Sequence, residues 1–258
     1  APDSLPVDWA ILGVPFDSAV TFRPGARFGP RAIRDASQSI RRYSLEHQLD
    51  LALAFSLADA GDTPVLPFDL QPSLQAITTH ALAIGHPKHT RILALGGDHS
   101  ISYALIKAAF LRHGAPKGGL ALVHLDSHFD TVDQVWGSSW SHASPFRRAV
   151  EDGLVNPRRM ISVGIKGPIN AQSDLDFARQ HGITIITQTQ LDSPAGPKAL
   201  SAFIKRIAGH PAYLSFDIDA SVINAHFPTY ANPAGDDYTG VEYGNDPSNP
   251  NRIGIWFH

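Results

Sequence analysis

The chain has 258 residues, no cysteine, 17% charged residues and a formal net charge of -3. The missing cysteine excludes disulfides, thiolate nucleophiles and cysteine zinc sites, and the near-neutral charge argues against nucleic-acid binding through bulk positive charge. No apolar run approaches the roughly 18 residues of a membrane span, and the first residues lack a signal-peptide pattern, so we expect a cytoplasmic protein with no membrane partner.

Short apolar runs alternate with helical patterns along the chain. In order, the patterns predict a strand at 9–14, a helix from Pro30, a strand at 91–95, a helix at 101–113, a strand at 120–125, a helix at 146–152, a strand at 160–165, a helix at 174–181, and strands at 183–187 and 212–216. The last three helices run into Gly114, Gly153 and Gly182, as helix ends often do. Continuous apolar runs are typical of strands buried on both faces of a parallel sheet. This alternation predicts an α/β fold with helices covering the sheet.

The last segment, residues 221–258, differs in composition. It is rich in Asn, Pro, Asp, Gly and Tyr, and only 253–257 has a strand pattern. We therefore expect a single domain over 1–258 with a soft boundary near residue 220.

Three of the apolar runs end in clustered aspartate and histidine. The motifs are Gly96-Gly97-Asp98-His99, Asp126-Ser-His128-Phe-Asp130 and Asp217-Ile-Asp219. Side chains at i, i+2 and i+4 of an extended segment face one side, and the carboxyl ends of parallel strands meet at one edge of the sheet. Carboxylates packed this closely require compensating cations, so the pattern predicts a metal site.

The expected ligand set indicates the kind of metal. Two imidazoles and four carboxylates form an oxygen-dominated shell that suits Mn²⁺ or Mg²⁺. Six ligands are too many for one ion but fit two ions about 3.5–4 Å apart that share carboxylates. Taken alone, Asp98-His99 is as typical of a helix N-cap as of a metal site. Taken alone, Asp217-Ile-Asp219 is more typical of the entry to a loop than of a metal site. The coincidence of all three motifs at strand ends favours the metal.

These motifs resemble the three metal signatures of the arginase/agmatinase (ureohydrolase) family. The resemblance extends to Gly13-Val-Pro-Phe-Asp17, to the block from Arg23 to Arg34 and to Ser141-His142-Ala-Ser-Pro-Phe, and it covers roughly residues 8–219. It implies a three-layer αβα sandwich with a mostly parallel sheet, two Mn²⁺ ions, and hydrolysis of a guanidino group to urea and an amine.

The resemblance also implies a role for each residue. One ion would be held by His99, Asp126, Asp130 and Asp217, and the other by Asp126, His128, Asp217 and Asp219. Asp126 and Asp217 would then bridge the ions. His142 occupies the position of the family's proton shuttle, with a surface-loop histidine as the alternative. His124, inside a strand run, is expected to be a hydrogen-bonded core residue rather than a ligand.

Two groups of arginines need an explanation. The first includes Arg23, Arg27, Arg31 and Arg34. Bunched arginines can mark an anion site, but an acidic metal pocket favours a cationic substrate, so we expect a structural or interface role. The pair Arg147-Arg148 is expected to cap a helix or to form salt bridges.

The loop after the second motif bears on the substrate. The stretch from Thr131 to His142 lacks the asparagine-rich pattern with which arginases of this family read an α-amino acid head. It resembles the agmatinase and guanidino-acid hydrolase branch. This implies agmatine, cleaved to putrescine, as the first candidate and guanidinobutyrate as the second.

After Asp219 the sequence departs from the family pattern, either by true divergence or through a change of frame or an unspliced segment in the gene. The glutamate that the family aims at the guanidinium has no clear counterpart, and Glu242 is the nearest candidate. Two alternatives to an active ureohydrolase stand beside it: an impaired or truncated relative that acts as a metal-binding interaction or regulatory subunit, and an amide hydrolase on the related deacetylase-type fold. The family resemblance further implies a homo-oligomer, a trimer or hexamer.

Overall fold

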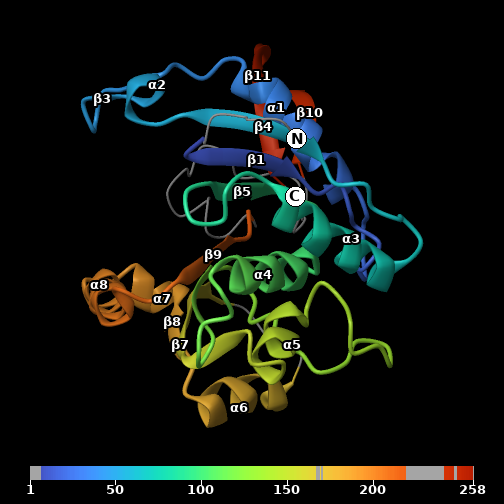
Figure 1. The fold of residues 1–258 in the computed structure, drawn as a ribbon, viewed down its shortest axis with the longest axis vertical. Helices are drawn as coiled ribbons and strands as arrows, with labels where there is room; N and C mark the ends of the chain where they lie inside the picture. The colour runs from blue at the N-terminus through green and yellow to red at the C-terminus, as the bar shows by residue number, and fades with distance from the viewer. Residues whose placement is uncertain (1–6, 167–168, 170, 219–240, 247–248, 258) are drawn as a thin grey trace. The chain divides into compact units, whose positions relative to one another are not determined.

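The computed structural model describes residues 7–166, 169, 171–218, 241–246 and 249–257. The chain comprises two compact units, residues 1–114 and 115–258, and each contains its own parallel sheet (Figure 1). The expected single domain over 1–258 stays a prediction. Among the described residues, no helix combines the length and apolar character needed to cross a bilayer.

The first unit is built on a three-stranded parallel sheet in the order β4-β1-β5. Its strands are β1 (Trp9–Gly13), β4 (Leu57–Asp62) and β5 (Arg91–Leu95), with a short hairpin of β2 (Tyr43–Ser44) and β3 (Leu49–Asp50). Its helices are η1 (Ala26–Phe28), α1 (Gly29–Ser37), α2 (Leu51–Ala54), α3 (Leu70–Ala83) and α4 (Ile101–Arg112). The predictions for β1, α1, β5 and α4 are confirmed to within about one residue at each end, which is the scatter expected of element boundaries.

Helices α3 and α4 pack against each other in this unit. The Thr78 hydroxyl in α3 donates to the Ala104 carbonyl in α4 at 3.1 Å, and the Arg112 guanidinium at the end of α4 donates to the Ile84 carbonyl at 2.6 Å. Strand β4 escaped individual prediction because its sequence, Leu-Ala-Asp-Ala-Gly-Asp, carries too few large apolar residues to stand out.

The second unit is built on a four-stranded sheet in the order β8-β7-β6-β9, and all its strands are parallel. The strands are β6 (Leu120–Leu125), β7 (Val155–Ile165), β8 (Thr184–Thr187) and β9 (Ala212–Phe216). The helices are α5 (Pro145–Glu151), α6 (Gln172–His181), α7 (Gln188–Leu191) and α8 (Ala195–Ile207). Gly182 ends α6 in the left-handed conformation, with φ 72°, as its place after a helical pattern predicts.

Helices cover both faces of this second sheet. On one face, Ile161 and Val163 of β7 form a buried cluster with Phe203 and Ile207 of α8. On the other face, the ring of the buried Phe146 of α5 packs at a tilt against His124 of β6, and α6 packs beside α5. The expected αβα layering around a parallel sheet is therefore confirmed.

The prediction that every strand is buried on both faces is wrong for β5 and β9. Leu93 of β5 is 47% exposed, and Leu214 and Phe216 of β9 are 65% and 51% exposed. Among the described residues, both strands lie at the edge of their sheet and pair with one neighbour only. An apolar run indicates a strand, but it does not say whether a helix or another strand covers that strand.

Near the C-terminus, β10 (Val241–Asp246) and β11 (Asn249–Phe257) form an antiparallel pair. The strand expected at 253–257 is therefore confirmed as part of β11. Residues 219–240 lie outside the described part of the chain.

Candidate metal centre

The carboxyl ends of β6 and β9 bring two of the expected ligands to neighbouring positions. Asp126 follows β6 and Asp217 follows β9 directly, and the two strands pair in register up to Leu125 and Phe216. The Asp217 N–H donates to the Leu125 carbonyl at 2.9 Å, and the Asp126 N–H donates to the Val163 carbonyl at 3.0 Å. The backbone therefore continues the sheet pairing one residue past the strands and fixes where both aspartates leave it.

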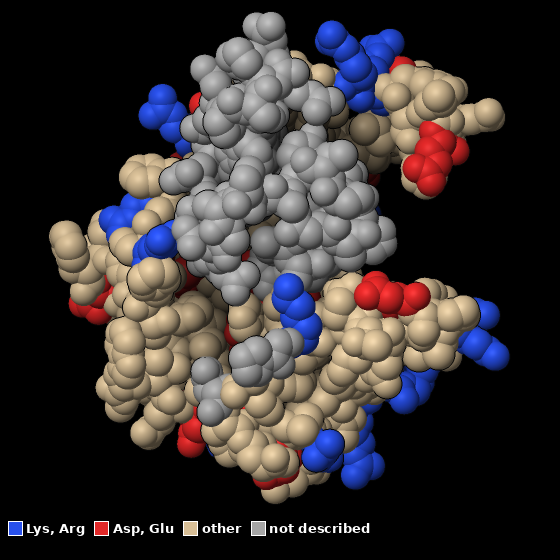
Figure 2. Space-filling model, turned by 180° about the vertical axis from the view of Figure 1, so that it is seen from behind, with Lys and Arg blue, Asp and Glu red and all other residues tan. Residues whose placement is uncertain are grey.

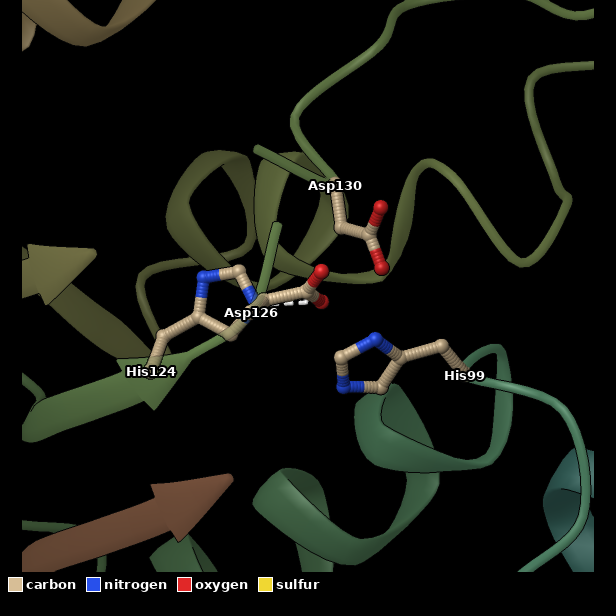
Figure 3. A group of neighbouring side chains, drawn as sticks. All are labelled: His99, His124, Asp126 and Asp130. Atoms are coloured by element: carbon tan, nitrogen blue, oxygen red, sulfur yellow. Dashed lines mark hydrogen bonds and ion pairs between the residues drawn. The ribbon is translucent and has the colours of Figure 1, made fainter. Parts of the chain in front are cut away.

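A buried group of acids and imidazole lies at this strand end (Figure 3). Potential ligand atoms of His124, Asp126 and Asp130 all lie within 4.8 Å of one another. His124 and Asp126 are fully buried and Asp130 is 5% exposed. Asp130 has φ 49°, a left-handed conformation that aspartate tolerates better than most residues. Two neighbouring buried carboxylates repel each other, so this arrangement is suited to a bound cation.

Both carboxylate oxygens of Asp126 have partners in the chain. Oδ1 accepts the backbone N–H of His128 at 2.7 Å, and Oδ2 lies 2.8 Å from Nε2 of His124. The His128 ring nitrogen Nδ1 lies 3.3 Å from Oδ1, and this side chain is 62% exposed. Asp126 is therefore held rigidly, with His128 beside it at the exposed side of the group.

The loop that carries His142 closes back onto the same strand end. The Phe146 N–H donates to the Asp130 carbonyl at 3.2 Å, and the Val132 N–H donates to the Ala143 carbonyl at 3.0 Å. His142 lies in the turn just before α5 and is half-buried. These two backbone hydrogen bonds therefore hold the segment that carries His142 beside Asp130.

Salt bridges fix the same loop to α5. Arg148 donates to Asp133 of the loop at 2.6 Å, and Arg147 lies 3.3 Å from the same aspartate. Within α5, Arg147 also pairs with Glu151 at 2.9 Å. The salt-bridge role expected for the two arginines is confirmed. Hydrogen bonding to Arg148 holds the pKa of Asp133 below its usual value.

Two further expected ligands are His99 and Asp219. His99 belongs to the first unit, in the turn between β5 and α4. A β-carbon on Gly97 would collide with the Val14 and Phe16 carbonyl oxygens, which explains the glycine in this turn. Asp98 accepts the Ser100 N–H at 2.9 Å, but Ser100 is the N-cap residue of α4 and makes no side-chain capping bond, so the helix N-cap considered for Asp98-His99 is not observed. Asp219 lies outside the described residues.

The structural role expected for the arginine block is confirmed at two positions. Arg27 pairs with the buried Asp17, which also accepts the Gly25 N–H at 2.7 Å. Burial acts to raise the pKa of Asp17, but the hydrogen bonds from Arg27 and Gly25 hold that pKa below its usual value. Arg34 of α1 donates to two aspartates of β4, Asp59 at 2.7 Å and Asp62 at 2.5 Å.

His124 is the residue whose importance the sequence understated. Its prediction as a buried, hydrogen-bonded histidine is confirmed, because Nδ1 lies 3.2 Å from the Ser162 hydroxyl and Nε2 faces Asp126. The available signal was its spacing, since residues two apart on a strand face the same side. The two carboxylates of the group, Asp126 and Asp130, supply the oxygen donors that a hard divalent cation prefers.

A parallel α/β fold with buried carboxylates and imidazole at a strand end defines a metal-binding α/β protein. The chain belongs to the arginase family, whose model matches residues 7–229. It is 37% identical over 214 residues to guanidinopropionase of Pseudomonas aeruginosa, covering 81% of this chain and 64% of that protein. It is 34% identical over 213 residues to the mitochondrial agmatinase of Gallus gallus, covering 83% and 61%.

A solved structure shares the fold. The proclavaminate amidino hydrolase from Streptomyces clavuligerus superposes with a TM-score of 0.73 at 31% identity, covering 83% of this chain and 69% of that one. The chain spans less than two thirds of the length of the guanidinopropionase and of the agmatinase. The names of these relatives describe hydrolysis of guanidino or amidino compounds by those proteins.

Proposed function

We propose that this chain is a binuclear manganese hydrolase that cleaves the guanidino group of a small cationic substrate to urea and an amine. The observation that carries the proposal is the buried group of Asp126, Asp130 and His124 at the end of β6, in a chain of the arginase family. The ligands proposed from the family resemblance are His99, Asp126, His128, Asp130, Asp217 and Asp219. Asp126 and Asp217 are the proposed bridging ligands.

When bound, a metal pair of this kind lowers the pKa of water and so supplies a nucleophile near neutral pH. The chain's own residues do the rest. Asp126, already fixed by hydrogen bonds at both oxygens, needs little reorganisation to accept ions. His142, on the loop anchored beside Asp130, is proposed to carry a proton on its imidazole to the departing amine nitrogen.

Agmatine, yielding putrescine, is the first proposed substrate and guanidinobutyrate the second. Both carry the planar guanidinium that the reaction requires, and they differ at the far end, where one has an ammonium and the other a carboxylate. The similarity to an agmatinase and to a guanidinopropionase supports the guanidino class as a whole.

Urea release is the direct test. The purified chain is incubated with Mn²⁺ and, separately, with agmatine, 4-guanidinobutyrate and 3-guanidinopropionate, and urea is measured over time, with metal-stripped protein as the control. We expect manganese-dependent urea from at least one compound and most from agmatine. A folded protein that binds manganese yet releases no urea from any of them would refute the proposed hydrolase activity. The alternative of a metal-binding regulatory subunit would then stand.

We also propose that the chain self-associates through an arm formed by residues 40–57, which contains β2, β3, α2 and the first residue of β4. The arm projects from the first unit beyond β4 (Figure 1). Six of its large apolar side chains are between 42% and 83% exposed: Ile40, Tyr43, Leu45, Leu49, Leu53 and Leu57. In Figure 2 most of its visible surface is neither acidic nor basic. Exposed apolar patches of this kind mark interaction sites.

The size of the arm fits such an interface. Its 18 residues approach the roughly 20–30 residues that each partner contributes to a standard interface. Light scattering is the measurement: Leu45→Asp combined with Leu53→Asp should lower the molar mass to that of the monomer. The matched control is Leu111→Asp, at an exposed apolar position on α4, which should leave the mass unchanged. Equal molar masses for wild type and the double variant would show that the arm is not part of the interface.

A further inference from the structure

His124 lies on β6 in direct register with Ser162 of β7. Both side chains are buried, with exposed fractions of 0% and 1%. The ring of Phe146 on α5 packs against the imidazole at 4.3 Å between centroids. Strand pairing on one side and a fully buried aromatic ring on the other therefore leave the imidazole little freedom to move.

Both nitrogens of His124 are engaged within the second unit. Nε2 lies 2.8 Å from Asp126 Oδ2, and Nδ1 lies 3.2 Å from Ser162 Oγ. An imidazole binds a metal through a nitrogen lone pair, and each ring has two nitrogens only. Although His124 falls within the group of potential ligands, it has no nitrogen left to offer an ion.

The hydrogen bonds at Asp126 have a second consequence. The His128 N–H donates to Oδ1 at 2.7 Å, and Nε2 of His124 lies 2.8 Å from Oδ2. Because the two bonds approach different oxygens, together they fix the rotation of the carboxylate about its Cβ–Cγ bond.

We infer that His124 is a positioning residue: its Nε2–H donates to Asp126 Oδ2 and sets the orientation in which that carboxylate would hold metal. Ser162 completes the arrangement by donating its hydroxyl to Nδ1, which fixes the proton on Nε2. The opposite tautomer would aim a lone pair at a buried carboxylate oxygen, which is unfavourable. The inference rests on the proposed function for the presence of the metal pair, but the hydrogen-bond chain is a property of the metal-free protein.

Two measurements test this inference. Nitrogen-15 NMR of the metal-free protein reports which nitrogen of His124 carries the proton. We expect the proton on Nε2 and a lone pair on Nδ1, and we expect Ser162→Ala to shift the Nδ1 resonance. Any other protonation pattern would overturn the assignment, whether or not the chain proves to bind manganese.

Calorimetric titration with Mn²⁺ measures the effect on the metal site. His124→Leu removes the hydrogen-bond donor and fills its space with an apolar side chain. It should weaken manganese binding about 10- to 100-fold, the range seen when residues that orient ligands are lost. His124→Gln, whose amide nitrogen can replace Nε2, should recover binding to within a few-fold of wild type. Ser162→Ala should give a smaller loss than His124→Leu. His181→Gln is the matched control, because that histidine bonds the Phe177 carbonyl outside this group.

The outcomes separate three possibilities. Unchanged affinity in a natively folded His124→Leu would overturn the inference, and so would a Gln variant as weak as the Leu variant, since volume rather than donation would then matter. If His124→Leu does not fold, Ser162→Ala and His124→Gln carry the test. Absence of manganese binding by wild type would refute the proposed function, while the NMR result would still decide the position of the proton.

Discussion

Replacing Asp126 with asparagine should separate metal binding from stability, because this side chain is fully buried beside a second carboxylate. The substitution keeps the shape of the side chain and removes one negative charge. If the role of Asp126 is to bind metal, its negative charge lowers the free energy of unfolding of the metal-free protein. The variant should then lose metal while its metal-free form stays as stable as wild type.

The size of the effect follows from the geometry. Potential ligand atoms of Asp126 and Asp130 lie within 4.8 Å, and at an effective dielectric of about 20 two such charges repel by about 3 kcal/mol. The Asp126→Asn substitution would weaken hydrogen bonds to a charged acceptor that are worth roughly 1.5–3 kcal/mol. The two changes offset each other. The free energy of unfolding without metal should therefore change by less than about 2 kcal/mol.

Urea denaturation in the presence of a chelator measures that stability, and calorimetry with Mn²⁺ measures binding. Manganese affinity should fall by more than roughly 100-fold, beyond the range for residues that only orient ligands. Asp192→Asn, at an exposed aspartate bonded to Gln188, is the matched control and should change neither quantity. A loss of more than about 3 kcal/mol in the metal-free variant would refute the reasoning, because breaking a buried structural ion network costs that much.

Three further substitutions test other parts of the chain. His142→Ala should lower turnover at least about 10-fold and leave manganese content unchanged, as measured by urea release and metal analysis; unchanged turnover returns His142 to a surface-loop role. Asp17→Asn should destabilise the protein by roughly 2 kcal/mol at neutral pH. Because the pKa of Asp17 is lowered in the fold, its contribution is complete above the ordinary pKa of 3.8 and is lost as pH falls through the lower, folded value; wild type and variant should thus converge in stability only in acid. Arg34→Met should lower the free energy of unfolding by about 1–2 kcal/mol in urea denaturation, since Arg34 joins α1 to two half-exposed aspartates of β4. Arg31→Met, at an exposed arginine 3.8 Å from its partner, should stay within about 0.5 kcal/mol, and equal losses would contradict the role assigned to Arg34.

Local sequence was sufficient for the positions of most strands. Runs such as 120–125 and 91–95 match β6 and β5 at both ends, because an apolar segment of this length between turn residues has few alternatives to a strand. Helix ends at glycine were equally readable, as at Gly182. Strand β4 was not, because its pairing with β1 and its bonds to Arg34 come from distant residues.

The candidate site divides in the same way. Side-chain alternation along an extended segment predicts that Asp126 and Asp130 converge, and the described group contains both. The extended segment itself is not observed, because β6 ends at Leu125 and Asp130 joins the group from the following loop with φ 49°. The partners of each Asp126 oxygen could not be read from the sequence. They depend on the register of β6 with β7, which aligns His124 with Ser162, and on the turn that returns the His128 N–H to Oδ1.

The sequence by itself determined the class of fold and the expected ligand types, because these follow from residue spacing along single strands, and its motifs carried the resemblance to the family. Only the tertiary structure decided which of these groups are buried, which are bonded and which remain exposed, as at His124, Asp126 and His128. The physical reason is that burial and hydrogen bonding join residues far apart in the chain. Strand register and helix packing control those contacts, and neither can be predicted from a local sequence pattern.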